Sequence, residues 1–137
     1  MTGPMSTGAA PVKRAPVPTW LVTGSRATER EAAIAARLET GVSCVAILEG
    51  LADGGSALAF DDPIPYDPPP QVLRIAPGCL HCSGNLILRV TLNRVLRHPP
   101  ARLYISLASA EHLELLRSWL SEAPYGDLLD LQSDIAA

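Results

Sequence analysis

The stretch Val42-Ser43-Cys44-Val45-Ala46-Ile47-Leu48 decides the fold class of this chain. This apolar run has the length of a strand and shows no strict alternation of polar and apolar residues, which is typical of a strand buried on both faces. Strands of that kind occur in parallel sheets whose two faces are covered by helices. The stretch therefore predicts an α/β fold with a mostly parallel sheet flanked by helices.

Segments with strand and helix signals alternate along the rest of the chain. Their order is strand, helix, strand, loop, strand, helix, strand, helix, which predicts right-handed crossovers between parallel strands. A last short element over 127–131 is either a strand or a turn. The predicted strands cover 19–23, 42–48, 71–75 and 102–107, and the predicted helices cover about 28–39, 84–98 and 109–121.

Capping residues and stop signals set the predicted helix boundaries. Thr28 and Glu31 have the spacing of a capping box, and Gly41 is a typical stop signal for the same helix. Ser83 and Ser109 can cap the two later helices. For the helix over 84–98 we expect a broad apolar face, with the arginines mostly away from it. The apolar residues concerned are Leu86, Ile87, Val90, Leu92, Val95 and Leu96.

The length and the distribution of proline and glycine predict a single domain. The chain has 137 residues, and its 13 prolines and 10 glycines are clustered rather than periodic. Residues 1–18 are rich in proline and have no apolar period, so we expect a disordered arm there. Residues 49–70 read as a long irregular connection. The α/β domain is expected to cover 19–137.

Charge and hydropathy exclude several classes of protein. The net charge of −3 argues against a nucleic-acid binder, because such domains usually carry an excess of basic residues. No apolar run reaches the roughly 18 residues of a membrane-spanning helix, and no signal peptide is evident, so we expect a cytoplasmic protein without a membrane partner. Charge is segregated locally: 71–117 has six arginines and two glutamates, whereas 118–137 has four acids and no base. We interpret these segments as solvated faces of different helices.

The motif Gly78-Cys79-Leu80-His81-Cys82 is the sharpest chemical signal in the sequence. Cys79, His81 and Cys82 offer two thiols and an imidazole, donors that suit zinc. Three cysteines in all do not indicate a disulfide framework. The alternatives are small, partly buried cysteines at a strand-to-helix joint, or redox exchange. A fourth metal ligand would come from water, a second chain, Cys44, His98 or His112.

The turn after the first predicted strand lies where α/β folds bind phosphate. A phosphate-binding loop needs a second glycine, a lysine and a hydroxyl residue, and here Glu29, Arg30 and Glu31 stand at those positions. Only Gly24 and Arg30 retain features that could contact a nucleotide. Glu31 places a carboxylate where it can occupy the helix N-terminal donors that a phosphate would use. We therefore expect no hydrolysis, and at most weak nucleotide binding, through this loop.

In their order, these features resemble the nucleotide-binding domain of the CobW family of metallochaperone-like GTPases. The segment 78–107 is similar to the family's GCxCC motif, its following helix and the next strand, and 45–49 is similar to the family's second strand. Cys79 and Cys82 match the outer cysteines, while His81 stands in place of the middle cysteine. The resemblance implies a P-loop NTPase-like fold, here truncated.

The resemblance also has clear departures. Thr23 and Gly24 alone match the phosphate loop, and 106–109 lacks the family's acidic residue and Thr-Gly pair. No base-specificity motif of the Asn-Lys-x-Asp kind is present. We therefore expect a degenerate, non-hydrolytic domain that binds a metal such as zinc and acts in metal handling or regulation. GTP is not expected as a cofactor. An active or weakly nucleotide-binding GTPase, and a non-catalytic interaction module with a protein partner or a homo-oligomer, are the alternatives.

Overall fold

Parallel strands form one six-stranded sheet in the computed structural model, which describes residues 15–50, 55–76 and 85–137. Their order across the sheet is β4, β3, β5, β2 and β6, and β7 also pairs with β2. The predicted α/β fold with a mostly parallel sheet is confirmed. The strands are β2 (Val17–Thr23), β3 (Cys44–Glu49), β4 (Gln71–Ile75), β5 (Arg102–Ser106), β6 (Leu129–Leu131) and β7 (Ile135–Ala136).

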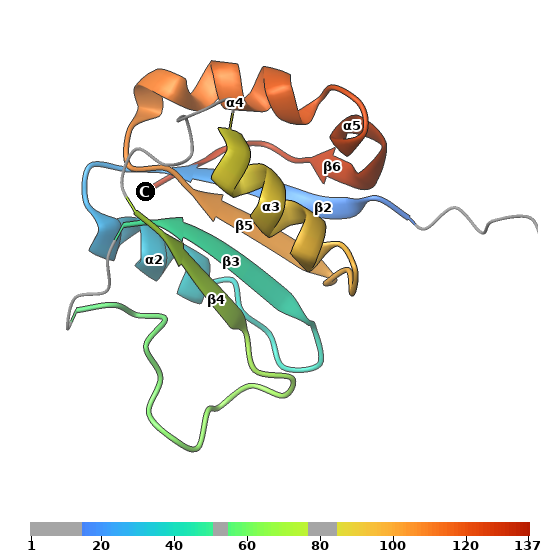
Figure 1. Cartoon of the computed structure of the whole chain (residues 1–137). Coiled ribbons are helices and arrows are strands. Elements are labelled where there is room, and N and C mark those ends of the chain that lie inside the picture. The colour runs from blue at the N-terminus through green and yellow to red at the C-terminus, as the bar shows by residue number, and fades with distance from the viewer. Residues whose placement is uncertain (1–14, 51–54, 77–84) are drawn as a thin grey trace, which may run out of the picture.

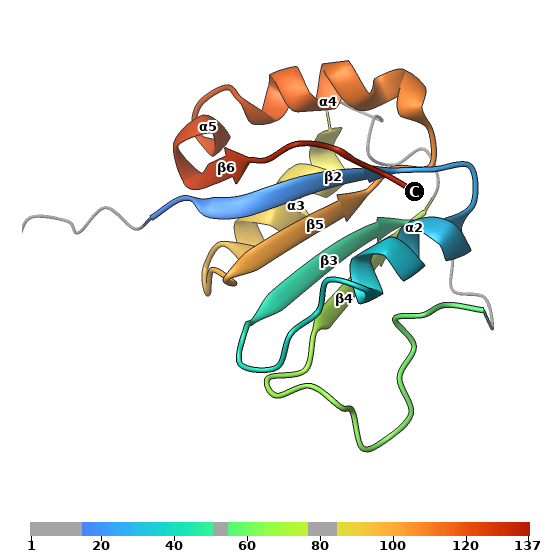
Figure 2. The ribbon, with the colours of Figure 1, turned by 180° about the vertical axis from the view of Figure 1, so that it is seen from behind.

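Helices cover both faces of this sheet. One face carries α2, and the other carries α3, α4 and α5 (Figures 1 and 2). The chain moves across the sheet from β2 to β3 to β4 and then returns to β5 and β6. Crossover connections between parallel strands have the same hand. The connecting helices therefore change to the other face of the sheet where the chain reverses its direction. The helical segments are α2 (Ala27–Ala35), α3 (Leu86–Val95), the 3₁₀ helix η2 (Ala110–His112), α4 (Leu113–Leu120) and α5 (Tyr125–Leu128).

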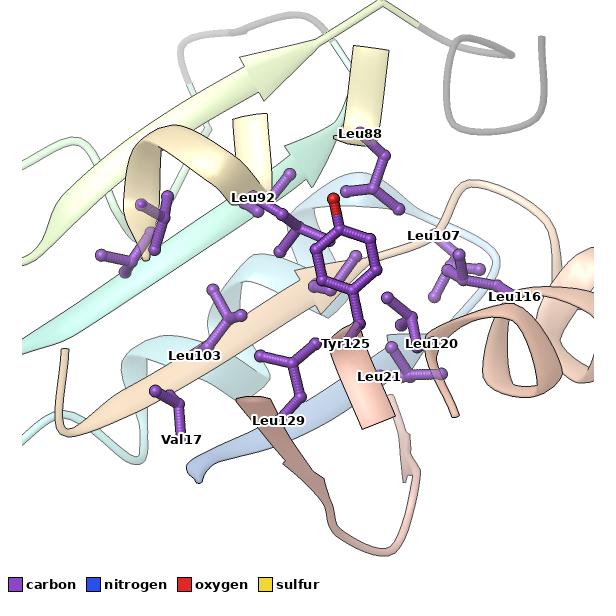
Figure 3. Packing of buried hydrophobic residues seen from close by; sticks show 14 of the residues in the cluster. Val17, Leu21, Leu88, Leu92, Leu103, Leu107, Leu116, Leu120, Tyr125 and Leu129 are labelled. Carbon is purple, nitrogen blue, oxygen red and sulfur yellow. The ribbon is translucent and has the colours of Figure 1, made fainter. Parts of the chain in front are cut away.

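Two apolar layers hold the sheet to its coverings. On the face of α3 and α4, side chains of β2 and β5 pack with Leu88, Leu92 and Leu116, and the Tyr125 ring lies among them (Figure 3). On the face of α2, Ile34 packs with β3 and with Tyr104. Every residue of β3 is buried, which confirms that this strand is covered on both faces. Both layers depend on β3, β5 and β2, the middle of the sheet.

The first helix differs from its prediction. It ends at Ala35, well before the expected end near 39, and Gly41 instead donates its N–H to the carbonyl oxygen of Asp67 at 2.8 Å. The capping box does not form, because Arg26 is the N-cap residue and no side chain caps the helix. The preceding strand begins at Val17, two residues before the predicted start.

The prediction of one broad apolar face on α3 is wrong, because half of the residues named for it are exposed to solvent. Leu88, Leu92 and Val95 are buried against the sheet, whereas Leu86, Ile87 and Val90 are exposed. At about 100° per residue, the second group lies on the far side of the helix from the first. The proposed cap Ser83 and the start at Gly84 lie outside the described residues.

The helix after β5 follows its prediction more closely. Ser109 caps η2 by accepting the N–H of Glu111 at 3.2 Å, as predicted. The short element expected over 127–131 consists of the end of α5 followed by β6. The strand β7 was not predicted, because its two residues are too few to give a pattern.

Gly126 in α5 allows the close approach of this helix to Ser121 to be tested. A Cβ atom at Gly126 would lie 2.2 Å from the carbonyl oxygen of Ser121, so Gly126→Ala must displace backbone. We expect a loss of about 1–3 kcal/mol in the free energy of unfolding, measured by urea denaturation. Gly41→Ala is the comparison: it has positive φ but no atom within 4 Å of its Cβ. Gly41→Ala should lower the free energy of unfolding by roughly 1–2 kcal/mol, because a residue with a Cβ atom is strained in a left-handed backbone. An unchanged stability of Gly126→Ala would contradict the packing of α5.

Candidate functional site

The candidate site lies at the carboxyl edge of the sheet, between β2 and β5. These strands are neighbours, and the chain leaves them toward opposite faces, to α2 and to α4. Open α/β sheets bind ligands in the crevice that such a reversal creates. An open pocket of about 480 Å³ is present there, lined by residues of 23–25, 108–110 and 136–137. Its lining residues are small, so the backbone forms much of its wall.

Arg30 is the central charged residue beside this crevice. Its side chain is buried, with 3% of the residue exposed, and its three nitrogen groups all donate to protein acceptors. Nε donates to Ser106 Oγ at 2.8 Å, Nη1 to the carbonyl oxygen of Gly24 at 2.8 Å, and Nη2 to the carbonyl oxygen of Glu49 at 3.3 Å. Burial lowers the pKa of Arg30, and the charges of Glu31 and Glu49 oppose that shift. The guanidinium therefore links the carboxyl ends of β2, β3 and β5.

Gly24 and Arg30, the two residues with possible nucleotide contacts, are thus brought together. A Cβ on Gly24 would lie 3.2 Å from Arg30 Cγ and 3.1 Å from Ala137 Cβ, so the stem of Arg30 packs tightly over the glycine. The Gly24 carbonyl oxygen accepts from the guanidinium. The two residues contact each other, and the donors of Arg30 are used by protein acceptors, one of them the carbonyl oxygen of Gly24 in the pocket lining.

Glu49 contributes the second buried charge at this edge. The residue is 2% exposed, and its Oε1 accepts the N–H of Ala108 at 2.8 Å. This hydrogen bond connects the end of β3 to the loop after β5. In the same loop, the N–H of Leu107 donates to the Val22 carbonyl oxygen at 2.9 Å. Sequence reasoning missed Glu49 and Ser106 as partners of Arg30. The position of Glu49 directly after a fully apolar strand is the only signal that could have pointed to it.

Glu31 is directed away from the crevice. Its carboxylate accepts a bidentate pair of hydrogen bonds from Arg74, at 2.9 and 3.1 Å, and a hydrogen bond from the Ser56 hydroxyl. The expectation that Glu31 occupies the N-terminal donors of its own helix is therefore wrong. The reason is the partly buried guanidinium of Arg74 on β4, which no local pattern reveals. This pair joins α2 to the far edge of the sheet.

The predicted metal ligands Cys79, His81 and Cys82 lie outside the described residues. Among the residues that the structure describes, no three His, Cys, Asp or Glu side chains are close enough to hold a metal ion. Cys44 lies at the amino end of β3 opposite Arg102, whereas Ile75, the last residue of β4, pairs with Glu49 at the other end of the strand. Cys44 therefore belongs to the opposite edge of the sheet from the end of β4.

The environment of Cys44 also opposes metal binding. The residue is 7% exposed, and burial raises the pKa of its thiol from 9.0 to about 11, with a smaller opposing effect from Arg102. Metals bind the thiolate, so a raised pKa weakens a cysteine as a ligand. Among the other proposed fourth ligands, His112 lines a pocket together with Asn85, the first described residue after the metal motif. His98 follows the far end of α3.

No protein-family model matches the chain, and no match was found among the curated proteins or among the solved structures. Within the described ranges, none of the helices has the length and apolar character needed to cross a lipid bilayer. The argument about function therefore depends on the residues themselves.

Replacing Arg30 tests the network at the carboxyl edge. Arg30→Met removes the donor to two carbonyl oxygens and to Ser106, and it removes the positive charge that interacts with Glu31 and Glu49. We expect a loss of about 3–5 kcal/mol in the free energy of unfolding by urea denaturation. The control is Arg26→Met, an exposed position that should change stability by at most about 0.5 kcal/mol. Equal effects of the two substitutions would contradict the network.

The reactivity of the Cys44 thiol tests its burial. The measurement uses the variant Cys79→Ala/Cys82→Ala, in which Cys44 is the only cysteine left. The rise in pKa from 9.0 to about 11 lowers the thiolate fraction about a hundredfold below that of an ordinary thiol. We expect alkylation of the native variant to be at least that much slower than alkylation of the same variant unfolded in urea. Rapid reaction of the native thiol would show that Cys44 is not buried in this layer.

Proposed function

We propose that this chain is a non-hydrolytic, CobW-like GTPase-type domain that binds a metal ion such as zinc through Cys79, His81 and Cys82 and acts in metal handling or regulation. The burial of Arg30 is the observation that carries the non-hydrolytic part of the proposal. The donors of Arg30 already bind Ser106, Gly24 and Glu49. Freeing this side chain for a phosphate would leave buried acceptors unsatisfied, which costs about 1–3 kcal/mol for each group.

The residue that follows Arg30 supports the same conclusion, because it is Glu31 and carries no hydroxyl. In a phosphate-binding loop, the residue after the lysine position carries the hydroxyl that holds magnesium. Glu31 stands there and faces Arg74 instead. A carboxylate held in a bidentate ion pair with Arg74 of β4 cannot also coordinate an ion beside β5 without breaking that pair. The loop thus lacks both the lysine and the hydroxyl residue that magnesium-dependent nucleotide binding normally uses.

The metal-binding part of the proposal is supported by the donor set and by the flanking residues. Two thiolates and an imidazole are ligands that zinc prefers. The strand before the motif ends at Ile75 beside Glu49, and α3 begins at Leu86, so both flanks belong to the carboxyl edge of the sheet. His112 shares a pocket with Asn85 and follows β5 at the same edge. We therefore infer that His112 is a better fourth ligand than Cys44.

Zinc at this site would supply a stable link between the loop before α3 and, through His112, the start of α4. Thiols and imidazole must lose their protons before they bind the metal, so the affinity must fall as the pH falls. No hydrolytic step is required for binding or release.

Zinc titration by calorimetry tests the assignment. We expect one zinc ion per chain at neutral pH, loss of binding in Cys79→Ala/Cys82→Ala, and weaker binding to the native chain at mildly acidic pH. His112→Ala should weaken zinc binding roughly 10–100-fold, as loss of one ligand or its support does at such sites. Cys44→Ala is the matched control and should leave the affinity unchanged. Binding that persists in the double variant would refute the site.

Equilibrium binding of a fluorescent GTP analogue, with and without magnesium, tests the other half of the proposal. We expect no magnesium-dependent affinity and no phosphate release above the rate of the buffer alone. Arg30→Lys restores the lysine of a phosphate loop and serves as the comparison. Magnesium-dependent binding by the native chain would show that Arg30 leaves its buried partners, and the chain would then be a nucleotide-binding domain.

A further inference from the structure

The outward face of α3 combines apolar and basic side chains. Leu86 and Val90 are 52% and 51% exposed, and Ile87 is 40% exposed. Arg94 and Arg97 are also exposed and follow on the same side of the helix, since positions three and four residues apart share a face. No acidic residue lies within the helix sequence 86–95. The face is therefore apolar over its first turns and cationic toward its end.

The outward face of α4 has the opposite charge. Leu115 is 69% exposed, the largest exposure among the large apolar side chains described. Glu111, in η2, lies four residues before it, and Glu114 and Glu122 are also exposed. The only base of this helix, Arg117, pairs with Asp134 at 2.8 Å. An exposed apolar residue in α4 thus has acidic residues before and after it in the sequence.

The two faces do not neutralise each other within one chain. α3 and α4 cover the same face of the sheet, and they contact each other through Arg89, which lies 5.5 Å from the ring centroid of Trp119 (Figure 1). In the described part of the chain, however, no ion pair joins the two helices, because the three ion pairs connect other elements. The basic residues of α3 and the acidic residues at the start of α4 are all exposed, and the two helices cover the same face of the sheet.

We propose that this face binds a second copy of the chain, with α3 of one protomer packed antiparallel against α4 of its partner. Val90 and Arg94 are four residues apart, and so are Leu115 and Glu111. In an antiparallel pair, Val90 therefore lies against the partner's Leu115 while Arg94 lies against the partner's Glu111. A two-fold axis repeats every contact, because each protomer offers both helices. The surface is thus complementary to itself in charge and in apolar content.

The pocket beside α4 gives the apolar residues a place to bind. It has a volume of about 420 Å³ and is lined by Asn85, His112, Leu115, Leu116 and Trp119. A leucine or isoleucine from the start of the partner's α3 fits the chemistry of this lining. Docking there removes from water side chains that the fold leaves exposed, which stabilises the complex by about 25 cal/mol for each Å² of apolar surface buried.

The charges favour a second copy over an anionic lipid surface. A membrane would attract Arg94 and Arg97 but would repel Glu111 and Glu114 on the neighbouring helix. A second copy of this chain supplies both charges in the required arrangement. The dimer does not require zinc, although the docking pocket includes His112, the residue inferred above to be the fourth zinc ligand.

Sedimentation over a range of protein concentrations, in metal-free buffer, tests the dimer through a charge exchange. Arg94→Glu/Arg97→Glu places acid against acid in the homodimer, and Glu111→Arg/Glu114→Arg places base against base. We expect each variant alone to dimerise at least about tenfold more weakly than the native chain. An equimolar mixture of the two variants should form a heterodimer of nearly native affinity, because both helix contacts are then complementary. Recovery on mixing also shows that both variants are folded.

The control is Arg26→Glu/Arg37→Glu, which makes the same change in net charge on the side of the sheet that carries α2 and should dimerise like the native chain. A native chain that stays monomeric up to about 1 mM would overturn the proposal. So would variants that weaken the dimer but do not recover on mixing. Binding of a monomeric native chain to phosphatidylserine vesicles, lost in Arg94→Glu/Arg97→Glu, would assign the face to a membrane instead.

Discussion

The buried guanidinium of Arg30 is the interaction on which the carboxyl edge of the sheet depends. β2, β5 and β3 are adjacent, and each contributes an acceptor where it ends: Gly24, Ser106 and Glu49. A buried cation is costly unless its donors are satisfied and an opposite charge is near. Here all three nitrogen groups have acceptors, and the carboxylates of Glu31 and Glu49 favour the charged form. One side chain therefore fixes the relative positions of three strand ends.

The same arrangement satisfies polar main-chain groups beside the crevice between β2 and β5. At the reversal between β2 and β5, the α/β plan brings together main-chain groups that a bound anion often satisfies. In this chain one such N–H group, that of Ala108, donates to the carboxylate of Glu49, while the carbonyl oxygens of Gly24 and Glu49 accept from Arg30. The loops are thus stabilised by the protein itself. The small residues that line the remaining pocket provide few side-chain donors for a ligand.

Local patterns predicted the elements whose burial follows from their own sequence. The fully apolar run around Cys44 gave the central strand, the alternation of 71–75 gave β4 with its observed bounds, and Ser109 gave its helix cap. The partners at the candidate site were out of reach of such patterns, because Arg30 and Ser106 are 76 positions apart. The capping box failed for the same reason: Glu31 gains more from Arg74 on a distant strand than from its own helix end. Apolar content alone also could not distinguish the buried from the outward side of α3.

The connection from β3 to β4 shows how irregular chain can cover a sheet in place of a helix. Leu58 is 5% exposed and packs in the same apolar layer as Ile34 of α2. Ser56 binds the Glu31 carboxylate, and the main chain of Asp67 binds both Thr40 and Gly41. The five prolines of 49–70 reduce the conformational entropy that such a long loop loses on folding. With the chain fixed at three separate points and stiffened between them, a helix is not needed to bury this part of the sheet.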